Sequence, residues 1–332
     1  MTSRMPAEWE PHEWLWIGFP WNADEWGDAD TLSRAQAQIA AFADAVRANG
    51  QGEQVRLVCN DEASADVARA LLTSDTQIVV ERLGDVWLRD TGPICVVNVA
   101  GERSLADFRF NGWGAKYQMP GDEDIGARLA ATTSLPCHAA PFIFEGGAVD
   151  TDGTGLFVTT EQCLLNPNRN PDLDRRQIET LLTGTLGLTD MLWLGDGLVN
   201  DHTDGHVDNL ARFVAPGVIA IPQATTDNDP NATIYADASA RAKAHGLTVA
   251  PMPSPGLVGV DGAVIPASYM NFTIGNAAVI VPIYGAPNDH AAVDALKPFF
   301  PDRDIVPLPS DGILAGGGSF HCTSQQMPVQ RS

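Results

Sequence analysis

The chain has 332 residues, of which 44% are hydrophobic and 19% charged, so it is long enough to bury the core of one large domain or two ordinary ones. Its formal net charge of −22 disfavours nucleic acid and anionic membranes as partners and suits a cationic small molecule, although solubility alone could also account for it. The sequence shows no basic, apolar leader and no apolar run near ~18 residues, which predicts a soluble, cytoplasmic protein. Five scattered cysteines without CxxC spacing predict reduced thiols and no zinc site built on cysteine.

The N-terminal segment is rich in tryptophan. Prolines at positions 6, 11 and 20 interrupt it, which predicts an irregular segment rather than a helix. Tryptophans at this density usually pack in a core or an interface, but they could also form the wall of a pocket for a cation. The tryptophans in question are Trp9, Trp14, Trp16, Trp21 and Trp26.

Beyond this segment, predicted helices alternate with predicted strands. The helix predicted over residues 171–183 has Pro171 in its first turn and Gly184 just after its end. This order predicts an α/β fold of about five similar units in a single domain, residues 1–332, although no repeat of fixed period relates the units. The predicted helix–strand pairs are 31–49 with 55–59, 62–72 with 77–80, 171–183 with 191–194, 231–244 with 247–250, and 288–299 with 304–308, and strands without a helix are predicted at 94–97 and 277–281.

Polar clusters follow several of these strands, where α/β folds place their functional loops. Arg89 and Asp90 stand beside Gly92-Pro93, which predicts either a turn that presents a carboxylate or a surface ion pair. Glu145 ends the apolar run 141–144, so its carboxylate must be paired or desolvated, and either would shift its pKa.

The densest polar cluster spans residues 200–209. A metal site built from His202, Asp204, His206 and Asp208 is one interpretation, because imidazole and carboxylate at short spacing are ligands of zinc or manganese. Against it, Gly205 interrupts a helical pairing of the two histidines. Residues 207–214 read as a strand, which would place His206 and Asp208 on one face as a general acid/base beside a carboxylate. The cluster alone leaves both interpretations open.

Near the end of the sequence, three glycines at 316–318 precede Cys322. A flexible tail with a buried cysteine is the plainer interpretation. A thiol together with an imidazole and several carboxylates favours covalent attack on an electrophilic carbon. Two carboxylates also match the planar N–H pairs of a guanidinium.

These motifs together resemble the agmatine deiminase family, which is related to arginine deiminase and bacterial peptidylarginine deiminase in the guanidine-modifying superfamily. The likeness extends over nearly the whole chain. The shared motifs are residues 6–13, 87–93, 145–147, 164–170, 203–209, 268–272 and 316–318, with His321-Cys322.

The resemblance implies a five-bladed α/β propeller, the pentein fold, and metal-free hydrolysis of a guanidino compound without a cofactor. By position, Cys322 resembles the nucleophile, His206 the general acid/base, and Glu145 the carboxylate that orients and charges His206. His321 is expected to point away from the site and to have no catalytic role. The substrate-binding residues that follow from the likeness are Asp90 and Asp208, which would hold the guanidinium, with Asn271, Trp87 and Trp113.

The implied reaction converts agmatine to N-carbamoylputrescine and ammonia, a step toward putrescine and the polyamines. The alternatives are another free guanidine, peptidyl-arginine, a His/Asp metallohydrolase and a non-catalytic guanidine-binding module. His202 stands where the family commonly has Glu, a change that concerns the far end of the substrate. An arginine-specific pocket would need a cation for the α-carboxylate, and the loops offer Arg89, Arg109 and Arg169. We expect a small cationic substrate, no nucleic-acid or membrane partner, and leave a homo-oligomer open.

Overall fold

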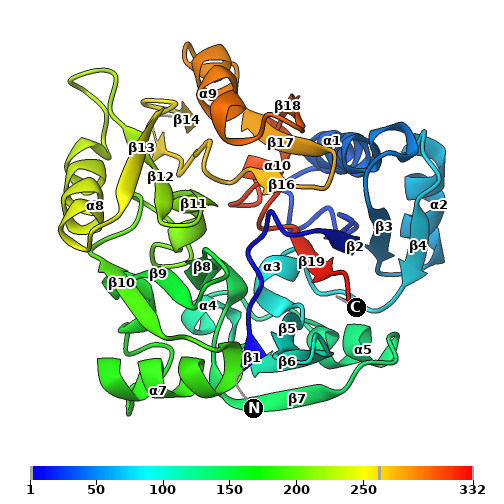
Figure 1. The fold of residues 1–332 in the computed structure, drawn as a ribbon. Coiled ribbons are helices and arrows are strands. Elements are labelled where there is room, and N and C mark those ends of the chain that lie inside the picture. Colours follow the sequence, from blue (N-terminus) through cyan, green and yellow to red (C-terminus); the bar gives the residue numbers. More distant parts are fainter. Residues whose placement is uncertain (1–2, 261–262, 331–332) are drawn as a thin grey trace.

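The computed structural model describes residues 3–260 and 263–330. Within these ranges the strands form five sheets of three or four strands and one two-stranded ribbon. Figure 1 shows the sheets distributed around the middle of the molecule, with the longer helices toward the outside. No helix among the described residues is long and apolar enough to cross a membrane.

Three of the five sheets consist of strands that are consecutive in the chain, and the other two each add a strand from near one end of it; the spatial order of the strands in each sheet is as follows. The first sheet is β19 (Ser324–Pro328), β2 (His12–Gly18), β3 (Gln54–Cys59) and β4 (Gln77–Val80), and the second is β1 (Ser3–Arg4), β5 (Ile94–Asn98), β6 (Arg103–Arg109) and β7 (Cys137–Ile143). The third is β10 (Asp190–Leu194), β9 (Leu156–Thr160) and β8 (Val149–Thr151), and the fourth is β11 (Arg212–Ala215), β12 (Val218–Gln223) and β13 (Thr248–Pro253). The fifth is β16 (Thr273–Ile274), β17 (Ala278–Ile283) and β18 (Asp304–Pro309), and the ribbon is β14 (Gly259–Val260) with β15 (Ala263–Val264).

The helices connect and cover these sheets. The α-helices are α1 (Ala29–Arg47), α2 (Glu62–Leu71), α3 (Leu88–Thr91), α4 (Gly112–Ala115), α5 (Ile125–Ala131), α6 (Glu161–Leu164), α7 (Arg175–Leu186), α8 (Ala232–Ala244), α9 (Asp289–Leu296) and α10 (Asp311–Leu314). The 3-10 helices are η1 (Ala48–Gly50), η2 (Gly146–Ala148), η3 (Val207–Asn209) and η4 (Lys297–Phe299).

The five sheets share one connectivity. In each sheet a central strand pairs antiparallel with one neighbour and parallel with another, and the parallel connection runs through a helix. For example, β12 pairs antiparallel with β11 and parallel with β13, and α8 lies between β12 and β13 in sequence. The predicted mixed α/β fold is thereby confirmed, but the five predicted helix–strand pairs do not correspond to the five sheets. The pairs 31–49 with 55–59 and 62–72 with 77–80 both lie in the first sheet, and the helix of the second sheet, α5, was not predicted.

The two ends of the sequence meet in the first sheet. Strand β19 pairs antiparallel with β2, so Ser324 lies opposite Ile17 and Gln326 opposite Leu15. Figure 1 shows the red β19 beside the blue β2. This pairing fixes Cys322, two residues before β19, beside the start of the chain rather than in a flexible tail.

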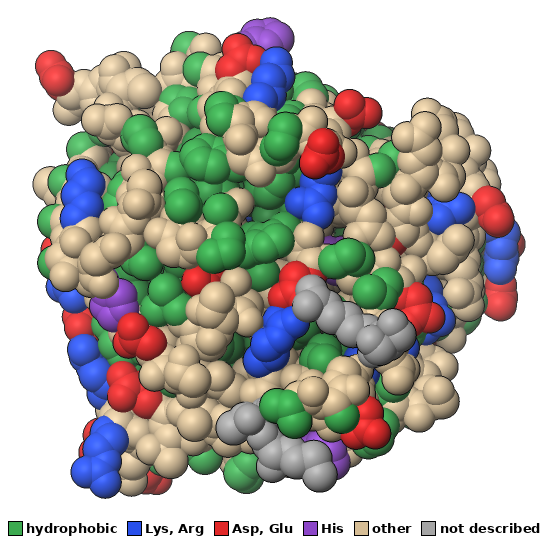
Figure 2. Space-filling view, in the orientation of Figure 1, with side chains coloured by type: hydrophobic (Ala, Val, Ile, Leu, Met, Phe, Trp, Pro, Cys, Tyr) green, Lys and Arg blue, Asp and Glu red, His purple; other side chains and the backbone are tan. Residues whose placement is uncertain are grey.

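Apolar periodicity explains where the helices pack. In α1, Ile39, Phe42 and Val46 are wholly buried and belong to the same apolar cluster as Leu57 of β3. Trp16 is also wholly buried, as expected for tryptophans that pack in a core. Figure 2 shows a stretch of hydrophobic side chains over part of one face and charged side chains of both signs scattered around it.

Three local predictions were wrong. Helix α7 begins at Arg175 rather than near Pro171, because Asp174 caps it, and it ends at Gly187 in the left-handed conformation rather than before Gly184. The tryptophan-rich segment is not irregular throughout, since β2 lies within it. The strand predicted over 207–214 is instead η3 followed by β11, so His206 and Asp208 do not share a strand face.

Candidate active site

Cys322 lies in a buried turn that glycine makes possible. Only about 5% of its surface is exposed, and its carbonyl oxygen accepts a hydrogen bond from the Arg89 amide at 3.0 Å. A Cβ atom on Gly318 would lie 2.6 Å from the Trp87 ring and 3.1 Å from Cβ of Cys322. A side chain at position 318 would therefore push the thiol and the indole apart.

The thiol has two polar neighbours. The side-chain amide of Asn271 donates to the Cys322 sulfur at 3.0 Å, and its oxygen accepts the Cys322 backbone N–H at 3.2 Å. The sulfur also lies 3.5 Å from Oδ2 of Asp208. Asn271 thus contacts the predicted nucleophile directly, while its predicted contact with substrate stays a prediction.

Two hydrogen bonds hold the Asp90 carboxylate in place near His206. It lies on α3, and its Oδ2 accepts a hydrogen bond from Nε1 of Trp113 at 2.9 Å. Its Oδ1 accepts the Gly147 amide at 3.0 Å and lies 3.6 Å from Nδ1 of His206. A Cβ on Gly147 would lie 2.6 Å from that nitrogen, so only glycine lets the backbone approach both groups.

Glu145 connects His206 to a buried cation. Its Oε1 accepts a hydrogen bond from Arg169 at 2.8 Å, and its Oε2 lies 3.8 Å from Nε2 of His206. All three side chains are wholly buried. Arg169 also pairs with Asp204 and donates to the carbonyl of Thr203 at 2.8 Å. The predicted alternative that Arg169 binds a substrate carboxylate is therefore disfavoured, because its donors are taken.

The carboxylates set the charge of His206. Burial disfavours the imidazolium, but Asp90, Cys163 and Glu145 outweigh it and hold the pKa of His206 well above its usual value. Burial likewise opposes ionisation of Glu145, yet the nearby positive charges of His206 and Arg169 keep the Glu145 pKa below its usual value. The arrangement therefore keeps His206 protonated and able to donate a proton.

The pKa values of Asp90, Asp208 and Cys322 shift in different directions. Burial raises the pKa of Asp90 to about 6, and the charges of Asp208 and Glu145 act in the same direction. For Asp208, the hydrogen bond and charge of His321 outweigh burial and lower its pKa. Burial, Asp208 and Asp90 all raise the pKa of Cys322 well above its usual value. Cys322 is thus a neutral thiol in the structure as described.

A cavity of about 170 Å³ leads to Cys322. Its acidic members are Glu25, Asp85 and Asp90, and no lysine or arginine of the described chain lines it. Its lining is Glu25, Asp85, Trp87, Asp90, Trp113, Tyr117, Met119, His202, Thr203, Ala315, the three glycines and Cys322. The predicted residues Trp87 and Trp113 therefore face this cavity, and a cation is the ligand that its charge suits.

The cavity contains residues that the sequence did not single out. The Tyr117 ring stacks on that of His202, with centroids 5.9 Å apart, and its hydroxyl lies 3.4 Å from Nδ1 of His202. Asp85 precedes the Trp87 motif, and its Oδ2 accepts Nε1 of Trp87 at 2.7 Å. Only the three-dimensional fold brings Glu25 and Tyr117 to these residues, whereas the closeness of Asp85 to Trp87 in sequence could have indicated its place.

The four residues of the predicted metal site are not gathered together. Asp204 pairs with Arg169 and Lys116, Asp208 contacts His321, and His202 lies at the cavity beside Tyr117. Among the described residues, one trio has potential ligand atoms within 4.8 Å of one another, namely Glu145, Cys163 and His206. Arg169 already supplies a positive charge to this trio at Glu145. The geometry therefore favours acid–base use of His206 over metal binding.

The other two arginines predicted as possible partners of a substrate carboxylate, Arg89 and Arg109, do not line the cavity either. Arg89 is buried, and its NH1 donates to Gln325 at 3.0 Å rather than pairing with Asp90. Arg109 is exposed at the end of β6.

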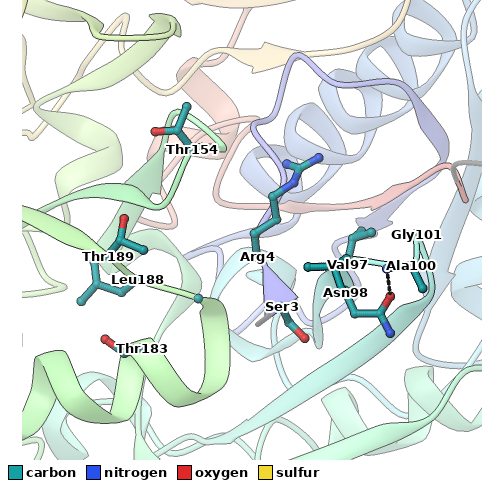
Figure 3. A pocket seen from close by; sticks show the side chains of 12 residues that line it. Ser3, Arg4, Val97, Asn98, Ala100, Gly101, Thr154, Thr183, Leu188 and Thr189 are labelled. Atoms are coloured by element: carbon teal, nitrogen blue, oxygen red, sulfur yellow. Dashed lines mark hydrogen bonds between the residues drawn. The ribbon is translucent and has the colours of Figure 1, made fainter. Parts of the chain in front are cut away.

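A larger pocket of about 560 Å³ lies elsewhere on the molecule, and Figure 3 shows Arg4, Asn98 and Thr189 at its wall. None of the predicted site residues lines that pocket.

The comparisons with known proteins agree with this geometry. The sequence model of the family described as Porphyromonas-type peptidyl-arginine deiminase matches residues 4–328. The chain belongs to this family. Among its relatives, the agmatine deiminases of Stutzerimonas stutzeri and Ectopseudomonas mendocina are each 37% identical, with 98% of this chain and 95% of each relative covered. The chain is accordingly an agmatine deiminase-like hydrolase, a class that acts on C–N bonds of linear amidines.

Solved structures of this family superpose closely on the chain. Agmatine deiminase of Enterococcus faecalis is 31% identical, with a TM-score of 0.92 over 99% of this chain and 97% of that one. A Cys-to-Ser variant of the C. jejuni agmatine deiminase, with substrate bound, is 28% identical with a TM-score of 0.91 over 99% and 97%. An amidinotransferase from Microseira wollei, 14% identical with a TM-score of 0.60, shares the mixed α/β fold.

Proposed function

We propose that this enzyme hydrolyses agmatine to N-carbamoylputrescine and ammonia through a covalent amidino intermediate on Cys322. The observation that carries the proposal is a cavity that Asp90 and the Cys322 thiol line and that no lysine or arginine of the described chain lines, with Asp208 3.5 Å from the Cys322 sulfur. We further propose that the five sheets are the blades of a five-bladed propeller, and that the enzyme is cytoplasmic and supplies putrescine formation.

Substrate binding activates the thiol. A guanidinium held by Asp90 and Asp208 would neutralise the charges that keep Cys322 protonated, so the thiol proton passes to solvent and the thiolate forms only when substrate is present. The same two carboxylates would present the planar carbon to the sulfur, and this orientation contributes on the order of several kcal/mol to lowering the barrier.

His206 then serves first as acid and later as base. The sulfur bonds to the guanidinium carbon, and His206 gives its proton to one amino group as the C–N bond breaks and ammonia leaves. Neutral His206 next takes a proton from water, and the hydroxide attacks the amidino-thioester carbon. The C–S bond breaks, Cys322 leaves as thiolate, and the ureido product loses its extra proton to solvent. Glu145 stabilises the charged form of His206 throughout.

The far end of the cavity favours a second positive charge. Glu25 and Asp85 line it, and Arg89 and Arg169 are engaged with Gln325 and with Glu145. Such a lining suits the amine of agmatine and offers no partner to the α-carboxylate of arginine. The two named relatives and the two similar structures are agmatine deiminases, which supports this choice over peptidyl-arginine.

Ammonia release measured side by side from agmatine, free arginine, guanidino acids and an arginine peptide tests the substrate. We expect kcat/KM to be highest for agmatine. A preference of about tenfold or more for any carboxylate-bearing compound, ~1.4 kcal/mol in transition-state binding, would overturn the agmatine assignment. Full activity after chelation and metal analysis is expected, whereas activity restored only by added metal would overturn the thiol mechanism.

A further inference from the structure

The general acid/base has a buried neighbour that the proposed mechanism does not use. Cys163 lies on α6 and is wholly buried, as are His206 and Glu145. Its sulfur, a ring nitrogen of His206 and a carboxylate oxygen of Glu145 all lie within 4.8 Å of one another. Cys163 therefore faces the catalytic imidazole on the side of Glu145.

The imidazole is not fixed in place by its two carboxylates alone. Asp90 and Glu145 lie 3.6 Å and 3.8 Å from its nitrogens, which is farther than a normal hydrogen bond. Both ring nitrogens and Oε2 of Glu145 lack a hydrogen-bond partner among the described residues. The carboxylates thus stabilise the charge of the ring but leave its tilt to the groups packed against it.

Helix α6 is tied to the loop that carries His206. The Thr160 hydroxyl accepts the Cys163 backbone N–H at 3.3 Å and donates to the carbonyl of Gly205 at 2.6 Å. On the same helix, the side-chain oxygen of Gln162 accepts the Gly197 amide at 2.8 Å. Cys163 and the backbone preceding His206 consequently share one hydroxyl and cannot shift independently.

We propose that Cys163 is a positioning residue for His206: its sulfur sets the tilt of the ring between Asp90 and Glu145 and receives a ring N–H when the imidazole is charged. The inference rests on the proposed deiminase function and deepens it. The charged or titratable groups that face His206 are Asp90 from α3, Glu145 before η2, Asp208 in η3 and Cys163 itself, with Arg169 acting through Glu145.

The test compares Cys163→Ala, Cys163→Ser and, as a matched control, Cys59→Ala. Cys59 is also wholly buried, but it is the last residue of β3, and none of the groups that shift the pKa of His206 is Cys59. We expect Cys163→Ala to lower kcat about tenfold with KM changed less than about twofold, because the guanidinium carboxylates remain in place. We expect Cys163→Ser to recover most of the loss, and Cys59→Ala to change stability but not kcat.

The pH dependence separates positioning from packing. Without the sulfur, the imidazolium loses a supporting group, so the alkaline limb of the kcat–pH profile of Cys163→Ala should move to lower pH. The proposal is overturned if kcat is unchanged, or if Cys163→Ala and Cys163→Ser lose kcat equally with an unmoved alkaline limb.

NMR of the substrate-free protein tests the role of Cys163 independently of whether the enzyme is a deiminase. The His206 ring proton signal, titrated by NMR without substrate, should shift its midpoint downward in Cys163→Ala and not in Cys59→Ala. If the wild type released no ammonia from any guanidino compound, the proposed function would fail, while the NMR comparison would still decide whether Cys163 acts on His206. An identical midpoint in wild type and Cys163→Ala overturns the inference.

Discussion

Nδ1 of His321 lies 2.8 Å from Oδ2 of Asp208, the oxygen that also lies 3.5 Å from the Cys322 sulfur. The other ring nitrogen of His321 lies 2.9 Å from Glu8, which pairs with Arg212. His321 contacts only Oδ2 of Asp208, and Oδ1 of Asp208 has no hydrogen-bond partner among the described residues. His321 therefore does not point away from the site as expected, but orients the carboxylate that we assign to the guanidinium.

The first prediction follows from this contact. His321→Ala should lower kcat/KM about tenfold, because Asp208 would lose a charge-assisted hydrogen bond in a buried site. Steady-state ammonia release measures this effect. His245→Ala is the control, since His245 pairs with Asp190 at the surface and should leave kcat/KM unchanged. Equal kcat/KM in the wild type and His321→Ala would show that Asp208 is oriented without His321.

The second prediction concerns the nucleophile. Cys322→Ala should reduce turnover by about a thousandfold or more while agmatine still binds, because Asp90 and Asp208 remain. Mass spectrometry of acid-quenched wild-type enzyme should reveal an amidino adduct that Cys322→Ala lacks. Cys137→Ala removes an exposed thiol and should retain the adduct. Appreciable turnover by Cys322→Ala would contradict covalent catalysis.

The third prediction concerns how kcat/KM falls at low pH. The pKa of Asp90 is raised to about 6 by burial and by Asp208 and Glu145, so in the free enzyme this carboxyl is protonated below that pH. Since guanidinium binding needs the ionised form, kcat/KM should fall as pH drops through about 6 and be stable above it until His206 loses its proton. A profile that stays flat down to about pH 5 would mean that Asp90 ionises normally or does not bind substrate.

The fourth prediction addresses the far end of the substrate. Glu25→Gln should lower kcat/KM for agmatine about tenfold, but hardly change it for an alkylguanidine of equal length that lacks the amine. Burial raises the pKa of Asp85 to about 6, with the Glu25 charge acting in the same direction, and the positive charge of a bound amine would oppose this rise. Asp311→Asn, at an exposed position, is the control. Equal losses for both substrates would place the amine elsewhere.

Local sequence patterns predicted the five longest α-helices and seven of the strands, because amphipathic periodicity is clearest in long helices; most of the other strands, among them β6, β7, β9 and β12, were not predicted. Two errors had physical causes that the periodicity did not reveal. Helix α7 begins at Arg175 because Asp174 and Gln177 form a capping box with reciprocal hydrogen bonds. Pro171 therefore lies before the helix and does not mark its start. Val207 and Leu210 are both buried in one apolar cluster, and a spacing of three suits the 3-10 turn of η3 better than a strand.

Motifs in the sequence pointed to residues that the structure brings together, since Asp90 and Glu145 lie 3.6 Å and 3.8 Å from the His206 ring, while their catalytic roles and that of Cys322 stay predictions. Residues that reach the site through long-range contacts were not predictable. Cys163 faces His206 only because α6 shares Thr160 with the loop that ends at Gly205. No spacing in the sequence encodes such an approach, since it depends on how neighbouring sheets pack.

The last prediction concerns stability rather than catalysis. Asp122 is buried near the cavity wall, where its Oδ1 accepts the Asp85 amide at 3.0 Å and its Oδ2 has no hydrogen-bond partner among the described residues. Burial raises the pKa of Asp122 to about 8, so the folded protein keeps this carboxyl protonated at pH values where the unfolded chain has released the proton.

The sign of the pH effect follows from the proton count. Between the unfolded pKa, about 4, and the folded pKa, about 8, folding takes up a proton at Asp122, so its contribution to the free energy of unfolding decreases as pH rises. Asp122→Asn keeps the oxygen that accepts the Asp85 amide but cannot ionise. It should therefore stabilise the protein relative to wild type more at pH 8 than at pH 5, as measured by urea unfolding at both pH values. A stability difference that is the same at both pH values would mean that Asp122 ionises alike in the folded and unfolded states.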